Sequence, residues 1–464
     1  MTKRPTPRAY KEAPAVLYKR KAIRKEPDSL LSLRFTLPII IENTFTIFIG
    51  LVLSRIFSGI SASAMAAIGM SNTVVTVVSS FFSIVSGSTA VIVSRHIGAG
   101  EGKEAGEIVG QSITLSTLLS LAITVLTIAF STPLFRLLIP TAEDALFNEA
   151  VGYFNIMMLS LPGLVLISVL SPIFRAMGSS HVSFAATMIT NISQLLFAWV
   201  FIQGFRLDEI GAGLAAVCCR ILGTLCLFWA LFRDHRFFTI HIKDMLSIHK
   251  DTCMRIFRLG IPMSLESIIV QFGYMLANSM AISLGTFESG VYQIINTLNS
   301  FAALAQGICS AIGTAVIGHL LGAGKPALAR KTGRGIWAAG IAATVFLCVT
   351  LMLAGKPLSA LYSSDPATIN ASAGLLWVLL VMDIAGVSIN AIDPQLKAGG
   401  DATFVMLITV SAVWLIRLPL TWLFCFKLNM GVLGIYIANA ISLYFRAVAG
   451  FIRHCGNKWY AKKI

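Results

Sequence analysis

Three acidic residues lie within long apolar stretches of this sequence: Glu42, Glu266 and Asp383. A charge near the centre of a bilayer costs about 2.5–3.5 kcal/mol on insertion scales, so such residues usually face a cavity or a partner. Burial favours the protonated form of a carboxyl group, which can take up a proton in one conformation and release it in another. A metal or organic cation competes for the same oxygens. These residues therefore predict reversible binding of a proton, Na⁺ or a positively charged substrate.

A second group of polar residues in the apolar stretches consists of amides and one arginine: Asn43, Asn72, Asn191, Gln271, Asn296 and Arg417. The amides are candidates for hydrogen bonds to a substrate in a cleft. They are equally able to join neighbouring helices, at roughly 0.6 kcal/mol each, and this is the stronger interpretation for any single one. Arg417 would either neutralise Asp383 or contact an anionic substrate. A salt bridge to Arg220 or Arg417 is the structural alternative for Asp383.

The composition indicates which elements position these residues. The chain has 464 residues, of which 56% are hydrophobic and 12% are charged. Its mean hydropathy is +0.80. Soluble domains carry about 25% charged residues, so soluble enzymes, secreted modules and disordered scaffolds are excluded. The sequence predicts a polytopic membrane protein.

Apolar stretches long enough to cross a bilayer, about 20 residues each, recur along the whole chain. They are 31–56, 62–94, 108–130, 148–174, 181–203, 211–233, 257–283, 287–320, 333–355, 370–394, 402–426 and 431–452. None alternates polar and apolar residues with the period of two that a transmembrane β-barrel requires. An all-α integral membrane protein with twelve transmembrane helices is therefore expected.

The basic residues predict the orientation of these spans. The formal net charge is +15, which in a soluble protein would suggest a nucleic-acid partner. With the N-terminus inside, 28 of the 36 Lys and Arg residues fall on the inner side. This is the positive-inside asymmetry. We therefore expect a cytoplasmic (inner) membrane protein with both termini in the cytoplasm, and no nucleic-acid partner.

The chain also contains an internal repeat at a separation of 224 residues. The pairs at that offset are Arg34 and Arg258, Pro38 and Pro262, Glu42 and Glu266, Asn72 and Asn296, Gly98 and Gly322, and Gly100 and Gly324. Further on the offset falls to 222, which pairs Pro172 with Pro394. Six spans in each half place both halves in the membrane in one direction, related by a pseudo-twofold axis along the membrane normal, with the substrate between them.

The repeat divides the chain into two lobes and three polar segments. We expect a basic N-terminal lead (1–30), an N-lobe of six spans (31–233), a cytoplasmic amphipathic linker (234–256), a C-lobe of six spans (257–452) and a cytoplasmic tail (453–464). Glu42 and Glu266 occupy equivalent places in the two lobes. If each lines the cleft between the lobes, the two acids face each other.

At this point the motifs resemble a known family. The first half carries LPIIIE (37–42), VSRHIGAGEGKEA (93–105) and FRAMGSSH (174–181), and the second carries GIPMSLE (260–266), IGHLLGAGKPALA (317–329), LKAGGDA (396–402) and RLPL (417–420). This ordered, duplicated set resembles the multidrug and toxic compound extrusion (MATE) family. The resemblance implies two six-helix bundles in a V shape. It also implies export of bulky, often cationic organic compounds against inward flow of Na⁺ or H⁺.

The resemblance also concerns the coupling ion. Many bacterial members carry an aspartate in the outer half of the first span, whereas the corresponding stretch here (50–55) has no acid. Sodium-coupled members bind the cation in the second lobe with a span-seven glutamate and a span-ten aspartate. This sequence has Glu266 and Asp383 on those spans, with Glu266 about one turn nearer the cytoplasm than the family pattern implies. A transient Na⁺ at these two residues is the one metal site that we expect.

Two other functions remain as alternatives. One is a flippase for a lipid-linked precursor from the same superfamily. The other is an intramembrane enzyme, which the sequence disfavours because all seven histidines lie in cytoplasmic loops or at inner helix ends. Neither glycine-rich turn is followed by the Lys-Ser/Thr of a phosphate-binding loop. We therefore expect a monomeric secondary transporter that needs no ATP and no cofactor.

Overall fold

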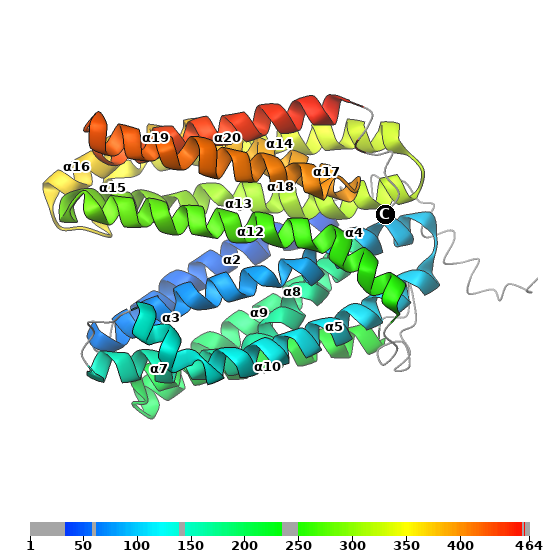
Figure 1. The fold of residues 1–464 in the computed structure, drawn as a ribbon, viewed down its shortest axis with the longest axis horizontal. Helices are drawn as coiled ribbons and strands as arrows, with labels where there is room; N and C mark the ends of the chain where they lie inside the picture. Colours follow the sequence, from blue (N-terminus) through cyan, green and yellow to red (C-terminus); the bar gives the residue numbers. More distant parts are fainter. Residues whose placement is uncertain (1–32, 58–61, 139–143, 234–248, 457–458, 460–464) are drawn as a thin grey trace, which may run out of the picture.

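The computed structural model describes residues 33–57, 62–138, 144–233, 249–456 and 459. The expected N-terminal lead, residues 234–248 of the expected linker and most of the expected tail lie outside these ranges. Every regular element in the described ranges is a helix. The helices fall into two bundles that approach each other at one end and diverge toward the other (Figure 1).

The N-lobe comprises the first half of the helices. They are α2 (Leu33–Phe57), α3 (Ala62–Phe81), α4 (Ser83–Ala99), α5 (Gly102–Ala129), α6 (Ser131–Leu138), α7 (Asp144–Leu159), α8 (Leu161–Ala176), α9 (Ser180–Ala198), the π-helical η2 (Trp199–Gly204) and α10 (Asp208–Arg233).

The C-lobe comprises the second half. Its helices are α12 (Lys250–Ser283), α13 (Thr286–Gly322), α14 (Pro326–Leu353), α15 (Gly355–Ala360), α16 (Pro366–Leu375), α17 (Trp377–Ala398), α18 (Ala402–Val410), η3 (Ser411–Arg417), α19 (Leu418–Trp422), η4 (Leu423–Lys427) and α20 (Gly431–Cys455). Helix α12 begins at Lys250, so the end of the expected linker is already continuous with the seventh span.

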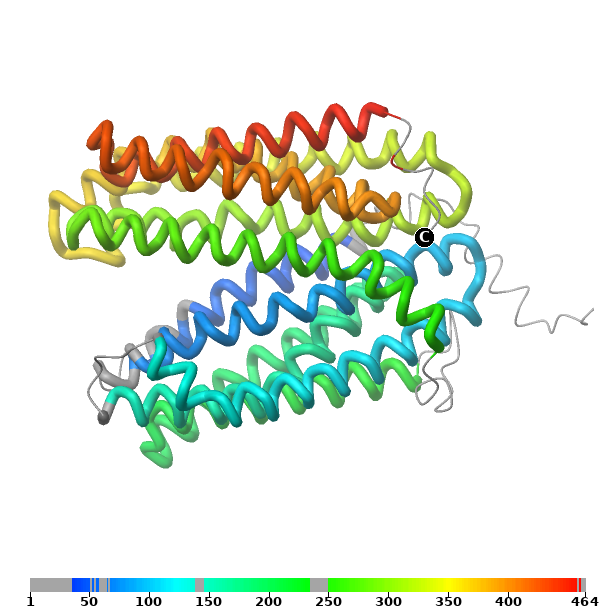
Figure 2. Tube along the Cα trace, in the orientation of Figure 1, coloured from blue at the N-terminus to red at the C-terminus, as the bar shows by residue number. Residues whose placement is uncertain are grey.

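Within the described residues, each of the twelve expected ranges is helical over most of its length. In the part of the chain that the structure describes, nine helices are long and apolar enough to cross a membrane unaided. Two further spans are pairs of helices bent by 41° and 44°, and Thr36–Gly50 is a shorter apolar helix. The tube in Figure 2 follows these helices through both lobes. The expected all-α membrane architecture is confirmed.

The two bends have different causes. The 44° bend between α7 and α8 coincides with Pro162, which cannot continue a preceding helix. The 41° bend between α3 and α4 has no proline. Instead, the Ser79 and Ser80 hydroxyls donate to the Thr76 carbonyl, and the Ser83 hydroxyl donates to the Ser80 carbonyl. Such back-bonding competes with the helical ladder and bends helices.

The two lobes meet at a seam where α4 packs against α12 and α13 and where α2 packs against α13. A Cβ atom at Gly98 would collide with the His319 backbone, and one at Gly322 would collide with the Arg95 backbone. Arg95 and His319 are themselves repeat equivalents, so the two contacts are related by the pseudo-twofold. The second glycine of each Gly-Ala-Gly sequence has another role, because Gly100 and Gly324 follow the ends of α4 and α13 with φ of 81° and 69°.

Candidate functional site

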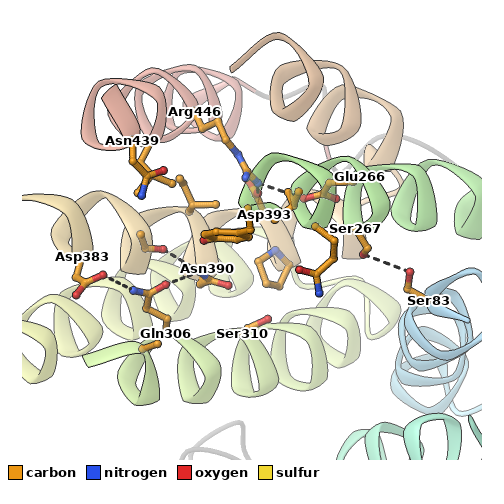
Figure 3. Close-up of a pocket in the computed structure, with 18 of the residues that line it drawn as sticks. Ser83, Glu266, Ser267, Gln306, Ser310, Asp383, Asn390, Asp393, Asn439 and Arg446 are labelled. Atoms are coloured by element: carbon orange, nitrogen blue, oxygen red, sulfur yellow. Dashed lines mark hydrogen bonds and ion pairs between the residues drawn. The ribbon is translucent and has the colours of Figure 1, made fainter. Parts of the chain in front are cut away.

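A polar cavity of about 540 Å³ lies in the C-lobe, where it faces the N-lobe. Side chains from α12, α13, α17 and α20 line most of it (Figure 3). Ser79, Ser80 and Ser83, at the bend between α3 and α4, supply the N-lobe part of the wall. The Ser83 and Ser267 hydroxyls lie 3.2 Å apart across this boundary. The cavity is therefore built largely by one lobe and closed by the other.

Glu266 belongs to a network of four charges at one end of the cavity. Its Oε2 lies 2.7 Å from Lys397 Nζ, and its Oε1 lies 3.2 Å from Arg446 Nη2. Arg446 Nη2 also lies 2.9 Å from Asp393 Oδ2. The four formal charges sum to zero. An incoming cation must therefore compete with Lys397 and Arg446 for the Glu266 oxygens.

Asp383 lies in the same cavity wall but in different surroundings. Its side chain is 1% exposed, and it accepts hydrogen bonds from Gln306 Nε2 at 2.9 Å and Cys348 Sγ at 3.7 Å. The Asn299 amide, with its nitrogen turned toward the carboxylate, donates to both oxygens at 3.2 and 2.9 Å. All three partners are neutral. Among the described residues no basic side chain forms an ion pair with Asp383.

The alternative of a salt bridge from Asp383 to Arg220 or Arg417 is therefore not realised in the described ranges. Arg220 Nη1 donates to the Ser160 hydroxyl in the N-lobe. The Arg417 guanidinium lies 4.5 Å from the centre of the Tyr274 ring and is 4% exposed. A cation held over an aromatic face is stabilised by the ring quadrupole without any acid. Arg417 is also not among the residues that line the cavity.

Glu42 is held within the N-lobe, and it is absent from the cavity wall. Arg175 Nη1 lies 3.2 Å from Glu42 Oε1, and Thr187 Oγ1 donates to the same oxygen at 2.9 Å. Ser183 Oγ lies 3.3 Å from it. The two repeat-related glutamates therefore do not meet across this cavity. Each is paired with a cation of its own lobe.

The candidate amides fall into two groups, one in the cavity wall and one bonded elsewhere in the lobes. Gln271 lines the cavity. The other four join helices or bond to their own backbone: Asn43 donates to the Ile39 carbonyl, Asn191 donates to the Thr46 hydroxyl, and Asn72 and Asn296 accept from the Tyr153 and Tyr436 hydroxyls. Helix joining, the stronger interpretation for any one amide, thus fits three of the five, since the Asn43 bond stays within α2.

Several polar residues of the cavity were not singled out from the sequence. They are Asn299, Gln306, Lys397, Asn439 and Arg446. A signal was present on α13, where Asn299, Ala303, Gln306 and Ser310 follow one another at intervals of four, three and four residues and so share one helix face. Lys397 was also detectable, because the offset of 222 pairs it with Arg175. Asn439 and Arg446 lie seven residues apart on α20, with Leu443 between them in the lining, so their spacing also places them on one helix face.

Metal-ligand clusters were sought throughout the described ranges. No group of three or more His, Cys, Asp or Glu side chains there could hold a metal ion. Glu266 and Asp383 also belong to separate contact networks. A joint Na⁺ site at these two residues stays a prediction, and it would require Glu266 to exchange at least one of its cationic partners.

Comparison with known families gives two matches to one family model. The MatE model matches residues 38–200 and again residues 262–423. The chain belongs to the MatE family. The two matches begin 224 residues apart, at the offset of the internal repeat. Members of this family are membrane transporters and not enzymes, so the enzyme alternative is excluded.

Relatives of this MatE protein cover nearly its whole length. An uncharacterized transporter, YisQ of Bacillus subtilis, is 26% identical over 96% of this chain and 98% of its own. A probable multidrug resistance protein, NorM of Thermotoga maritima, is 24% identical over 95% of this chain and 94% of its own. The multidrug export protein MepA of Staphylococcus aureus is 23% identical over 62% of this chain and 64% of its own.

Solved structures share the fold. An outward-facing conformation of a multidrug resistance MATE transporter superposes with a TM-score of 0.84 at 18% identity, covering 96% of this chain and 98% of that one. A MATE in a straight conformation superposes with a TM-score of 0.82 at 19% identity, and the match also covers 96% of this chain and 98% of that one. These likenesses confirm the architecture of two six-helix bundles in a V shape.

Proposed function

We propose that this MatE protein exports small organic compounds, often cationic, in exchange for H⁺ or Na⁺ by alternating access between its two lobes. Its relatives support the export of drugs or toxins, because curated proteins similar over nearly the full chain are named as multidrug resistance proteins. The proposed location is the cytoplasmic membrane, with the basic ends of the helices inside. The working unit would be a monomer that uses neither ATP nor a cofactor.

One observation carries the proposal: Asp383 is a buried acid in a cavity wall, surrounded by neutral hydrogen-bond donors. An ionised carboxylate in such a place lacks the compensation that a basic partner supplies. A proton, a Na⁺ ion or a positively charged substrate would each supply it. Because only one of them can occupy the carboxylate at a time, loading the inward-moving ion would displace the outward-moving compound.

The charged network around Glu266 would tune this exchange. Glu266, Asp393, Lys397 and Arg446 sum to zero charge, so Asp383 determines the net charge of the cavity. The cavity would thus be negative when Asp383 is ionised and neutral when it is protonated. A cationic compound is held by the first state and released by the second. The seam of Gly98 and Gly322 would have to open for the cavity to reach the other side of the membrane.

Transport in proteoliposomes tests the proposal. Vesicles loaded with ethidium are given a Na⁺ gradient or a pH gradient separately, and we expect one of the two to drive ethidium movement. Asp383→Asn should reduce the gradient-driven rate of ethidium transport at least tenfold, which corresponds to about 1.4 kcal/mol of activation free energy. The matched control is Asp365→Asn, because Asp365 is an exposed acid that caps α16.

Two results would overturn the proposal. If neither gradient moves ethidium, ion-coupled export of organic cations is wrong. If Asp383→Asn transports as well as the control, Asp383 is not the coupling acid. Movement of a labelled lipid-linked pyrophosphate without movement of ethidium would favour the flippase alternative instead.

A further inference from the structure

A second cavity, of about 610 Å³, opens at the seam between the lobes on α2, α13 and α14. It shares no lining residue with the polar cavity. Thr36 and Ile40 of α2 form its N-lobe wall, while Ile308 and Ile312 of α13 are among the C-lobe residues. The lining is apolar apart from Lys331 and two threonines. We call it the seam crevice.

One face of α14 forms a trough along this crevice. Gly335, Ala339 and Ala343 line it at intervals of four residues and are exposed. Residues at this spacing lie above one another on one helix face. Lys331 continues the row toward the start of the helix at Pro326. Lys331 is exposed in the crevice lining, and among the described residues no acid forms an ion pair with it.

The length of the trough matches one membrane leaflet. From Lys331 to Ala343 the helix rises about 18 Å, at 1.5 Å per residue. The hydrocarbon of one leaflet is about 15 Å thick, half of a typical bilayer core. Lys331 lies within two turns of the start of α14 at Pro326, and lipid headgroups are expected at the end of a span. An extended acyl chain can therefore lie along the small residues while its headgroup reaches the ammonium.

The repeat-equivalent side of the molecule lacks this trough. At the offset of 224, Lys331 corresponds to Glu107, which lies 3.9 Å from Lys103. Gly335 corresponds to Gln111, and Ala339 and Ala343 correspond to the larger Leu115 and Leu119. In addition, the Gln111 side chain accepts a hydrogen bond from the backbone of His249, just before α12. The crevice is thus a feature of one side of the pseudo-twofold and does not follow from the duplication.

We propose that the seam crevice binds an acyl chain of one anionic phospholipid, with the lipid phosphate at Lys331. The apolar lining accepts the chain, and a basic residue between helices at the headgroup level favours an anionic lipid over a neutral one. Because α2 belongs to one lobe and α13 and α14 to the other, the bound lipid bridges them. It therefore stabilises the arrangement in which the lobes meet at this seam.

Lipid retention by the full-length, detergent-purified protein tests the proposal without reference to transport. The protein is stripped of lipid and incubated with phosphatidylglycerol or phosphatidylcholine. Retained lipid is counted by native mass spectrometry, and the thermal midpoint is recorded. We expect the wild type to hold one phosphatidylglycerol about tenfold more tightly than phosphatidylcholine, and to melt at a higher temperature when it does.

Two substitutions, each with a control, test binding of the acyl chain and binding of the lipid headgroup separately. Ala339→Phe fills the trough and should abolish retention of both lipids, whereas Ala338→Phe, at the adjacent exposed position outside the lining, should not. Lys331→Gln should still retain a lipid but should lose the preference for phosphatidylglycerol over phosphatidylcholine. The control Lys103→Gln, in the N-lobe, should keep that preference.

Three outcomes would overturn the proposal. The first is equal lipid retention by Ala339→Phe and Ala338→Phe. The second is an unchanged preference for phosphatidylglycerol in Lys331→Gln. The third is loss of ethidium binding in Ala339→Phe with lipid retention intact, which would assign the crevice to substrate.

Discussion

The two buried glutamates occupy equivalent places in the repeat and yet have different surroundings. Glu42 pairs with Arg175 and is bonded by Thr187, and Glu266 pairs with Lys397 and is bonded by Thr409. The offsets of 224 and 222 relate every member of one set to a member of the other. The repeat has therefore preserved a whole cluster: an acid on the first span of each lobe, a base on the fourth and a threonine on the fifth.

The difference lies in what each lobe adds to this cluster. The C-lobe adds Asp393 and Arg446. Their N-lobe equivalents are Ser171, at the offset of 222, and Leu225, at an offset of 221 that also pairs Gly213 with Gly434. It also places Asp383 in the cavity wall, where the N-lobe has the buried Leu161. The N-lobe cluster is thus a closed ion pair, and the C-lobe cluster is part of a larger network beside a cavity. The residues that the two lobes share form the same scaffold in each, and the residues that differ place only the C-lobe cluster beside the cavity.

The largest expected effect is a loss of stability on replacing the base that pairs with each glutamate, Arg175 or Lys397. Arg175→Met leaves Glu42 buried with hydroxyl partners only, so we expect a loss of about 3–5 kcal/mol in stability, as when one partner of a buried pair is removed. Lys397→Met leaves Glu266 with Arg446, so its loss should be less than half as large. Thermal unfolding in detergent measures both. Equal losses would mean that Arg446 does not compensate Glu266.

The seam between the lobes predicts equal losses of stability when its equivalent glycines are replaced. Gly98→Ala and Gly322→Ala each push a methyl group against the backbone of the other lobe, and overpacking of this kind costs about 1–3 kcal/mol. The two variants should shift the thermal midpoint by the same amount. Gly69→Ala is the control, because no atom lies within 4 Å of its added Cβ. A large difference between Gly98 and Gly322 would contradict the pseudo-twofold at the seam.

Transport rates should distinguish the role of Glu266 from that of Glu42. Glu266→Gln alters the wall of the polar cavity, so we expect the rate of driven ethidium export to fall about tenfold, a change of about 1.4 kcal/mol. Glu42→Gln alters a residue outside that wall and should reduce the rate less than threefold. The sequence alone assigned the two glutamates the same role. Equal losses in the two variants would restore that interpretation, provided that both proteins are produced at the wild-type level.

The sequence was informative about the scaffold because the membrane imposes strong rules on it. Apolar length and the internal repeat predicted an all-α membrane architecture of two bundles, which is confirmed, whereas the orientation predicted from the charge asymmetry stays a prediction. Which acids share a cavity could not be predicted, because the way each helix face is turned depends on packing between helices. Glu42 and Glu266 have the same spacing from a proline and an arginine, yet only Glu266 lines the polar cavity.

Helix breaks were predictable in part. Pro162 marks the bend between α7 and α8, but the bend between α3 and α4 arises from three serine hydroxyls acting together. The corresponding residues of α13 are Ala303, Leu304 and Gly307, and α13 runs unbroken for 37 residues. A lone serine in a helix carries little signal. Only the comparison of the two halves shows that this cluster is specific to the N-lobe.

The smallest expected effect concerns the two threonines. Thr187 Oγ1 lies 2.9 Å from its glutamate and Thr409 Oγ1 lies 3.5 Å from its own. A hydrogen bond to a charged group contributes about 1.5–3 kcal/mol, and one stretched to 3.5 Å contributes much less. Thr187→Val should therefore lower the thermal midpoint more than Thr409→Val does. The reverse order would mean that the C-lobe glutamate depends on its hydroxyl despite having two cations, and the contrast between a closed pair and an open network would fail.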